Sequence, residues 1–195
     1  NYRATEKLDA WLKKRNIIGI TGIDTRALTA RIRETGMPNG VIAHAPDGYF
    51  HEPSITAELN AFPGLEGLDL AKEVTTAQTY KWDQQTWKWN EGYATLEDPQ
   101  FHIVAVDYGA KRNILRCLAS AGCEVTVLPA SATAEDVLAL NPEGVFLSNG
   151  PGDPAPCDYA IAAIREFIAA KIPTYGICLG HQLLGLAAGA QTMKM

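Results

Sequence analysis

One cysteine stands between two glycines in residues 175–182, which read Tyr-Gly-Ile-Cys-Leu-Gly-His-Gln. The apolar residues 172–177 predict a buried strand before Cys178, and leucines at helical spacing follow it. A strand, a sharp turn, a nucleophile and a helix together form a nucleophile elbow, here with cysteine in place of serine. Gly176 and Gly180 suit such an elbow because a strained turn leaves no room for side chains beside it.

The position of Cys178 predicts a reactive thiol. At the N-terminus of a helix the dipole favours thiolate over thiol, and thiolate is the nucleophilic form. The alternative is a buried cysteine at the end of a core strand, which is the commoner environment of a free cysteine. The glycines on both sides of the cysteine favour the reactive interpretation.

A second turn is predicted close to the first. Residues 145–147 form a short apolar strand, and residues 148–154, Ser-Asn-Gly-Pro-Gly-Asp-Pro, end it abruptly. By itself this composition is typical of an ordinary turn. In an open parallel sheet, however, the loops at the carboxyl ends of the strands converge on one crevice, where Cys178 also belongs. Gly150 and Gly152 could bring backbone N–H groups to a bound carbonyl there, and each donor to a developing oxyanion is worth roughly 3 kcal/mol.

The residues around Cys178 resemble the signature of the class I glutamine amidotransferases. In that family the cysteine attacks the side-chain amide of glutamine, releases ammonia and leaves a glutamyl thioester that water hydrolyses. The resemblance implies that Cys178 is the catalytic nucleophile and that the N–H groups of Gly150 and Leu179 bind the oxyanion. It also implies that Gly152, Leu179 and Gln182 contact L-glutamine, and it implies no metal.

Longer stretches narrow this resemblance. They are residues 106–114, 148–160, 22–29, 62–65 and 69–74. They look like the family of small, glutamine-hydrolysing chains of carbamoyl-phosphate synthetase, and the last three resemble a domain that precedes the glutaminase in that family alone. The resemblance implies a partner, the large synthetase chain, which binds ATP and Mg and makes carbamoyl phosphate from bicarbonate and ammonia for arginine and pyrimidine biosynthesis. No cofactor is expected in this chain, since it has no GxxxxGK[ST] phosphate-binding motif.

The catalytic base is expected to lie outside these residues. In the family, a histidine held by a glutamate takes the thiol proton, and both lie well downstream of the elbow. The chain stops at Met195, so we expect a partial chain that lacks both residues. His181 follows Cys178 by three residues, but its side chain would leave along the helix body.

A non-catalytic module that docks on and regulates the large synthetase chain is the alternative function.

Composition limits the partners and the compartment. The chain is 47% hydrophobic and 20% charged, as in globular proteins, and its net charge of −5 argues against a nucleic-acid or anionic membrane surface. Its four cysteines show no CxxC pair, so neither a zinc site nor a secreted disulfide framework is indicated. Charged residues interrupt the apolar stretches, which predicts no membrane span. The expected location is cytoplasmic, where a thiolate stays reduced.

Residues 99–195 predict an α/β domain in which strands and helices alternate. The strands are expected at 102–106, 124–128, 144–147 and 172–177, and the helices at 111–121, 133–140, 158–170 and 179–188. Four successive βα units indicate a doubly wound parallel sheet. The resemblance implies that this is the N-terminal part of a class I glutamine amidotransferase domain, which has a flavodoxin-like fold. The inner face of the helix at 158–170 is predicted to contain Ile161, Ile164 and Ile168. The chain is expected to stop just inside another strand at Met195.

Residues 1–98 predict a smaller α+β domain, the C-terminal part of the small chain's N-terminal domain by resemblance. Helices are expected at 6–15, 25–34 and 55–60, strands at 40–44 and 80–89, and an interdomain linker at 90–100. The tryptophans between 80 and 89 alternate with polar residues, which favours packing in a half-exposed sheet. A binding surface is the alternative interpretation of these tryptophans.

Overall fold

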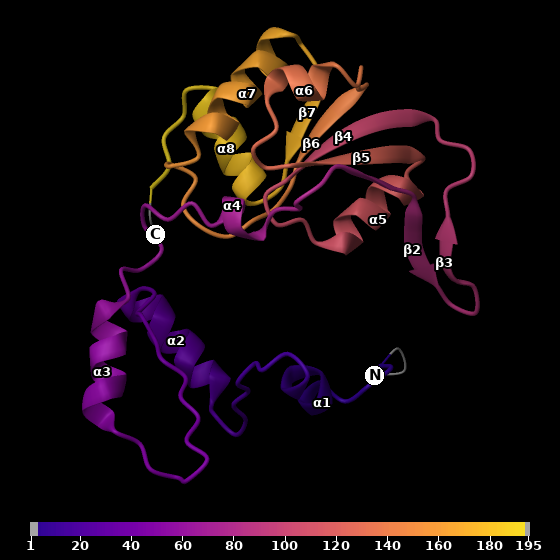
Figure 1. Ribbon diagram of the computed structural model, residues 1–195. Coiled ribbons are helices and arrows are strands. Elements are labelled where there is room, and N and C mark those ends of the chain that lie inside the picture. Colours follow the sequence, from indigo (N-terminus) through magenta and orange to yellow (C-terminus); the bar gives the residue numbers. More distant parts are fainter. Residues whose placement is uncertain (1–3, 194–195) are drawn as a thin grey trace. The chain divides into compact units, whose positions relative to one another are not determined.

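The computed structural model describes residues 4–193 and divides the chain into two compact units, with the boundary between Gly64 and Leu65 (Figure 1). The second unit contains a five-stranded sheet in the order β1-β5-β4-β6-β7. Strands β4 (Phe101–Asp107), β5 (Cys123–Pro129), β6 (Gly144–Leu147) and β7 (Thr174–Gly176) are parallel. The α/β prediction is confirmed, with one addition: the edge strand β1 (Tyr80–Trp82) runs antiparallel to β5.

The four βα units follow the predicted pattern. The chain passes from β4 to β5 on one side and then crosses to β6 on the other side of β4. This reversal creates a switch point between β4 and β6, where open α/β sheets bind their ligands. The strand expected at Met195 lies outside the described residues.

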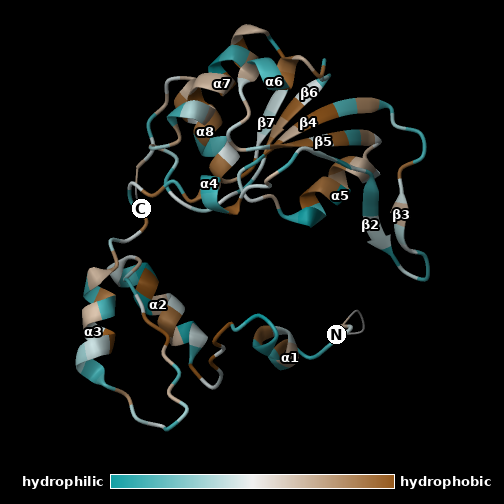
Figure 2. Ribbon diagram, in the orientation of Figure 1, coloured by the Kyte–Doolittle hydropathy of each residue, from teal (hydrophilic) through white to brown (hydrophobic). Residues whose placement is uncertain are grey.

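Helices cover both faces of this sheet (Figure 1). One face packs on α5 (Arg112–Ser120), and the other on α6 (Ala134–Leu138), α7 (Asp158–Ala169) and α8 (Leu179–Ala187). Successive residues of β4 serve the two cores in turn, as a pleated strand requires: Val104 faces α7 and α8, and Ala105 faces α5. Figure 2 shows the resulting hydrophobic stretches along β4 and β5.

The inner face of α7 differs from the prediction at one position. Ile164 is fully buried and Ile161 is partly buried, but Ile168 is 43% exposed. Phe167, at 1% exposed, takes the inner position instead. The buried face also includes Ala160 and Ala163, so it is centred on the 160, 163, 164 and 167 positions and places residue 168 at its edge.

Among the described residues 4–64, the first unit contains three helices, as predicted. They are α1 (Leu8–Lys13), α2 (Thr25–Thr35) and α3 (Glu52–Ala61). Asp24 caps α2 by accepting hydrogen bonds from the backbone N–H groups of Arg26 and Ala27, and Gly36 ends it at φ +83°. The predicted strand at 40–44 is wrong: these residues pair with no other segment among those described, and a strand is stable only with a partner. No described residue from 4 to 64 is fully buried.

The linker predicted at 90–100 is also wrong. Strand β3 (Gly92–Thr95) lies within it and pairs with β2 (Gln84–Lys88) in a two-stranded sheet beside α5. The turn between them uses positive φ angles at Asn90 (64°) and Gly92 (75°), which favour a tight hairpin. Trp82 packs against the core on the α5 face, whereas Trp89 is 64% exposed. The division of the chain into one family domain at residues 1–98 and a second at residues 99–195 stays a prediction.

A short helix, α4 (Ala71–Val74), precedes β1 and buries Ala71 completely. None of the helices in residues 4–193 has the length and apolar character needed to cross a lipid bilayer.

The contrast between Phe167 and Ile168 predicts unequal effects on stability. Phe167→Ala should lower the free energy of unfolding by about 3–5 kcal/mol because it leaves a cavity in the core. Ile168→Ala, at the exposed edge of the same helix, should cost less than about 1 kcal/mol. Urea denaturation of the two variants checks this, and equal losses would contradict the observed face of α7.

Candidate active site

The elbow at Cys178 is a strained connection between β7 and α8. Cys178 has φ +54° and ψ −113°, a backbone conformation that L-residues rarely adopt. A Cβ at Gly176 would lie 2.5 Å from the carbonyl carbon of Gly180, and one at Gly180 would lie 2.3 Å from the carbonyl oxygen of Leu147. Only glycine fits at either position, as predicted. Cys178 is exposed, so the alternative of a core cysteine is wrong.

Cys178 occupies the N-cap position of α8. Its carbonyl oxygen accepts a hydrogen bond from the Gln182 backbone N–H at 3.0 Å, which begins the helix. The first N–H groups of a helix have no partner within it and carry its positive dipole end. Cys178 therefore lies at the positive end of the α8 dipole.

The loop after β6 approaches this helix closely at Gly150. A Cβ there would lie 2.2 Å from the carbonyl oxygen of Tyr108 and 2.8 Å from Leu179 Cδ2. The structure thus brings together Gly150 and Leu179, the two residues predicted to bind an oxyanion. Neither of their N–H groups donates a hydrogen bond to another of the described residues. The Gly180 N–H donates to the Ser148 carbonyl at 3.0 Å and joins the loop to the elbow.

Two polar side chains that the sequence analysis did not single out join this loop to the one after β4. The buried Ser148 hydroxyl accepts from the Tyr108 N–H at 2.8 Å. The Asn149 amide donates to the Gly109 carbonyl at 2.9 Å and accepts from the Lys111 N–H at 3.1 Å. Their position in the sequence, directly after a buried strand and beside the switch point, could have indicated that they belong to the site.

Asp107, at the end of β4, is a third such residue. One of its carboxylate oxygens accepts from the N–H groups of Gly109 (2.8 Å) and Ala110 (2.6 Å), and the other accepts from Thr76 N–H at 2.8 Å. The side chain is almost fully buried, at 6% exposed, so these three donors replace its hydration. Asp107 holds the turn whose Tyr108 carbonyl lies against Gly150.

Gly152 and Gln182 take less direct positions. Gly152 has φ +93°, and the nearest atoms to a Cβ there are the Leu68 carbonyl oxygen (2.7 Å) and the Leu70 nitrogen (3.0 Å) rather than the elbow. Gln182 is exposed, one turn beyond Cys178 on α8. Their contacts with glutamine stay predictions.

No histidine is joined to the cysteine by a hydrogen bond within residues 4–193. His181 is exposed on α8, as expected for a side chain that leaves along the helix. His102 is the second residue of β4, near the amino end of the strand and away from the carboxyl-end loops, and its Nε2 lies 2.8 Å from Thr126 Oγ1. His51 caps α3 by accepting from the Ser54 N–H.

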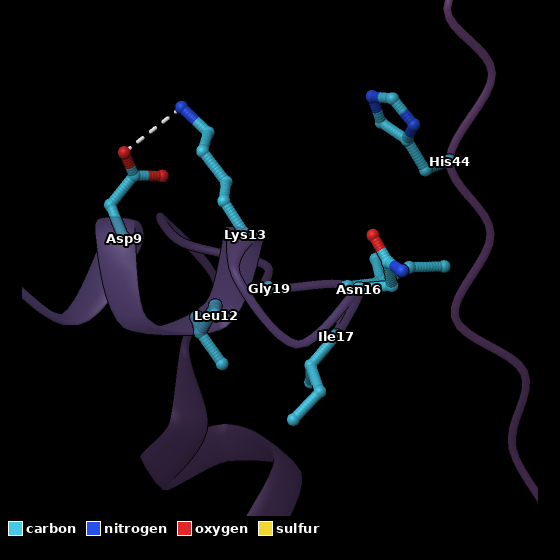
Figure 3. A pocket seen from close by; sticks show the side chains of 8 residues that line it. Asp9, Leu12, Lys13, Asn16, Ile17, Gly19 and His44 are labelled. Atoms are coloured by element: carbon cyan, nitrogen blue, oxygen red, sulfur yellow. Dashed lines mark ion pairs between the residues drawn. The ribbon is translucent and has the colours of Figure 1, made fainter.

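His44 borders an open pocket in the first unit (Figure 3). The pocket also contains Asp9 and Lys13, whose exposed side chains form an ion pair at 2.9 Å. The imidazole stands apart from this pair in Figure 3. Across the described residues, no three His, Cys, Asp or Glu side chains gather as metal ligands.

The buried cysteines have environments opposite to that of Cys178. Burial, together with the charge of Asp69, raises the pKa of Cys157 to about 11. Burial, together with the charge of Glu143, also raises the pKa of Cys123. Both thiols therefore stay protonated near neutral pH and are poor nucleophiles.

Both parts of the chain are similar to known families. Residues 104–195 match the family described as Glutamine amidotransferase class-I, and residues 1–42 match Carbamoyl-phosphate synthase small chain, CPSase domain. The chain is 60% identical over 198 residues to the Carbamoyl phosphate synthase small chain of Rhizobium meliloti (strain 1021), covering 100% of this chain and 49% of that protein. It is 57% identical over 196 residues to the one of Caulobacter vibrioides, covering 100% of this chain and 50% of that protein. The predicted resemblance is confirmed, and the chain spans about half the length of the curated relatives it matches.

Alkylation rates should rank the cysteines by environment. Iodoacetamide at neutral pH should modify Cys178 first, because it is exposed at a helix N-terminus, and Cys157 and Cys123 last. Cys117 is the matched reference: it is exposed too, but lies near the C-terminal end of α5 rather than at a helix N-terminus. Peptide mapping by mass spectrometry gives the rates, and equal rates at Cys178 and Cys117 would contradict activation by the elbow.

Proposed function

We propose that the natural protein containing this chain, which is similar along all of it to carbamoyl phosphate synthase small chains, hydrolyses L-glutamine at Cys178. One observation carries the proposal: an exposed cysteine on a strained elbow at a helix N-terminus, with Gly150 against the following residue, Leu179. This arrangement supplies a nucleophile and two backbone donors in one place.

The reaction follows from these groups. The Cys178 thiolate attacks the carbonyl carbon of the glutamine side chain, so a C–S bond forms and the carbonyl oxygen gains negative charge. The backbone N–H groups of Gly150 and Leu179 stabilise that oxygen. The C–N bond then breaks, ammonia leaves and a glutamyl thioester remains, which water hydrolyses to glutamate and free thiol.

Release of ammonia requires a proton donor, because an amide nitrogen leaves poorly without one. We assign this step to a histidine oriented by a glutamate, as the family resemblance implies. His181 is not assigned this role, since its side chain is exposed and makes no hydrogen bond to Cys178 within the described residues.

The ammonia is consumed, in this proposal, by a large synthetase chain that binds ATP and Mg and forms carbamoyl phosphate from bicarbonate. The support is the name of the relatives, small chains of carbamoyl phosphate synthase, and the sequence, which contains no GxxxxGK[ST] motif. We place the complex in the cytoplasm, where the thiol stays reduced.

Cys178→Ser should abolish glutamine-dependent synthesis of carbamoyl phosphate by the complex. A hydroxyl has no comparable ionised fraction without a strong base. Synthesis from free ammonia should continue, because the large chain does not use the thiol in that case. Measuring both activities in the purified complex checks this, and loss of both would count against a purely catalytic role of Cys178.

Gly150→Ala should slow glutamine hydrolysis by about a hundredfold or more, because its Cβ displaces the loop from the Tyr108 carbonyl and with it an oxyanion donor. Gly185→Ala on α8 is the matched control, since a Cβ there meets only ordinary contacts. Steady-state glutaminase assays compare the two, with circular dichroism to show that both are folded. Normal turnover in a folded Gly150→Ala protein would reduce the motif to an ordinary turn.

A further inference from the structure

The segment before β1 contacts the loops at the carboxyl ends of three strands. We call residues 65–76, which include α4, the strap (Figure 1). The Thr76 N–H donates to Asp107, the last residue of β4, and Thr75 Oγ1 accepts from the Ala130 N–H after β5 at 2.8 Å. The strap also contacts the loop after β6, which contains Gly150, and Tyr159 in the first turn of α7.

Two hydrogen bonds join the strap to this loop, one to a carboxylate side chain and one between backbone groups. The Gly67 N–H donates to Asp153 Oδ2 at 2.9 Å, and the Asp153 N–H donates to the Leu68 carbonyl at 3.0 Å. Gly152 lies so close to Leu68 that a Cβ would be 2.7 Å from its carbonyl oxygen. The hydrogen bonds from the Gly67 and Ala155 N–H groups lower the pKa of Asp153, so its charge is maintained at neutral pH.

Asp69 extends these contacts to the start of α7. Its Oδ1 accepts from the Tyr159 hydroxyl at 3.2 Å and from the Cys157 thiol at 3.5 Å. Its Oδ2 lies 3.1 Å from Lys72 Nζ, which also sits 4.2 Å above the centre of the Tyr159 ring. Burial alone would raise the pKa of Asp69, but the hydrogen bonds from Lys72 and Cys157 and the charge of Lys72 hold it below its ordinary value.

The loop between β6 and α7 is therefore held at both ends. Ser148 and Asn149 hold the end next to β6, and Asp69 holds the end next to α7 through Cys157 and Tyr159. Gly150 lies between these anchors. Its N–H can stay aimed at a reacting carbonyl only if neither end shifts, since a displacement of about 1 Å is enough to weaken catalysis.

We propose that Asp69 is a positioning residue for the oxyanion donor at Gly150, an inference that rests on the proposed glutaminase function. The carboxylate does not take part in the chemistry. It holds the α7 end of the loop, so its loss should affect the transition state, in which the oxyanion is formed, more than the binding of glutamine.

The test compares Asp69→Ala with Glu73→Ala in the whole natural protein. Both changes remove one carboxylate from the strap, but Glu73 is exposed and outside the anchor. Asp69→Ala should lower kcat for glutamine at least about tenfold with KM changed less than about twofold, while Glu73→Ala matches the wild type. Asp69→Asn keeps one oxygen acceptor for Tyr159 and Cys157 and should restore part of the lost kcat.

A glutamine analogue with an aldehyde in place of the amide provides a second readout. Cys178 adds to its carbonyl, and the oxygen of the adduct occupies the oxyanion position. Its affinity should fall in Asp69→Ala by about the same factor as kcat, because the adduct resembles the transition state. A folded Asp69→Ala protein with unchanged kcat, or with reduced kcat but unchanged aldehyde affinity, would overturn the inference.

The remaining outcomes are also decisive. If Asp69→Ala does not fold, Tyr159→Phe removes one hydroxyl from the same carboxylate, and the same two assays should show losses in the same direction. Unchanged values in Tyr159→Phe would then overturn the inference. A wild-type protein that fails to hydrolyse glutamine would contradict the proposed function itself, whereas an active wild type with an unaffected Asp69→Ala contradicts the role of Asp69 alone.

Discussion

The contact between the first turn of α8 and the end of β6 determines the geometry of the whole site. The Ile177 N–H donates to the Leu147 carbonyl at 3.1 Å, and Gly180 packs so closely that a Cβ would lie 2.3 Å from the same oxygen. The helix can begin this close to the strand only if the chain turns sharply at Cys178, which accounts for its positive φ. A backbone strain of this kind persists because the packing around it leaves no alternative.

The cysteines show how position sets chemistry within one chain. The Cys178 sulfur is exposed at the start of a helix, whereas Cys157 is buried against Asp69, and its pKa is raised to about 11. A cysteine thiol is thus a candidate nucleophile at position 178, whereas at position 157 it donates a hydrogen bond to Asp69 in a structural contact. Both belong to the loops at the carboxyl ends of the strands, where a ligand would bind in a sheet of this topology.

The sequence by itself determined the features that depend on local spacing. The four βα units were predicted with nearly correct bounds, and so was the need for glycine on both sides of Cys178. Each rests on interactions within about one turn or one strand, namely hydrophobic periodicity and steric exclusion. The resemblance that pairs Gly150 with Leu179 likewise depends on short motifs, and the two residues do lie in contact.

Only the tertiary structure decided the features that need a partner far along the chain. The apolar residues 40–44 have no partner strand among the described residues, whereas 92–95, predicted as linker, pairs with β2. Asp69 gives no local signal of its contact with Cys157, which is 88 residues away. Strand pairing and buried polar contacts depend on which distant segments the fold brings together. The local sequence around each segment therefore does not predict them.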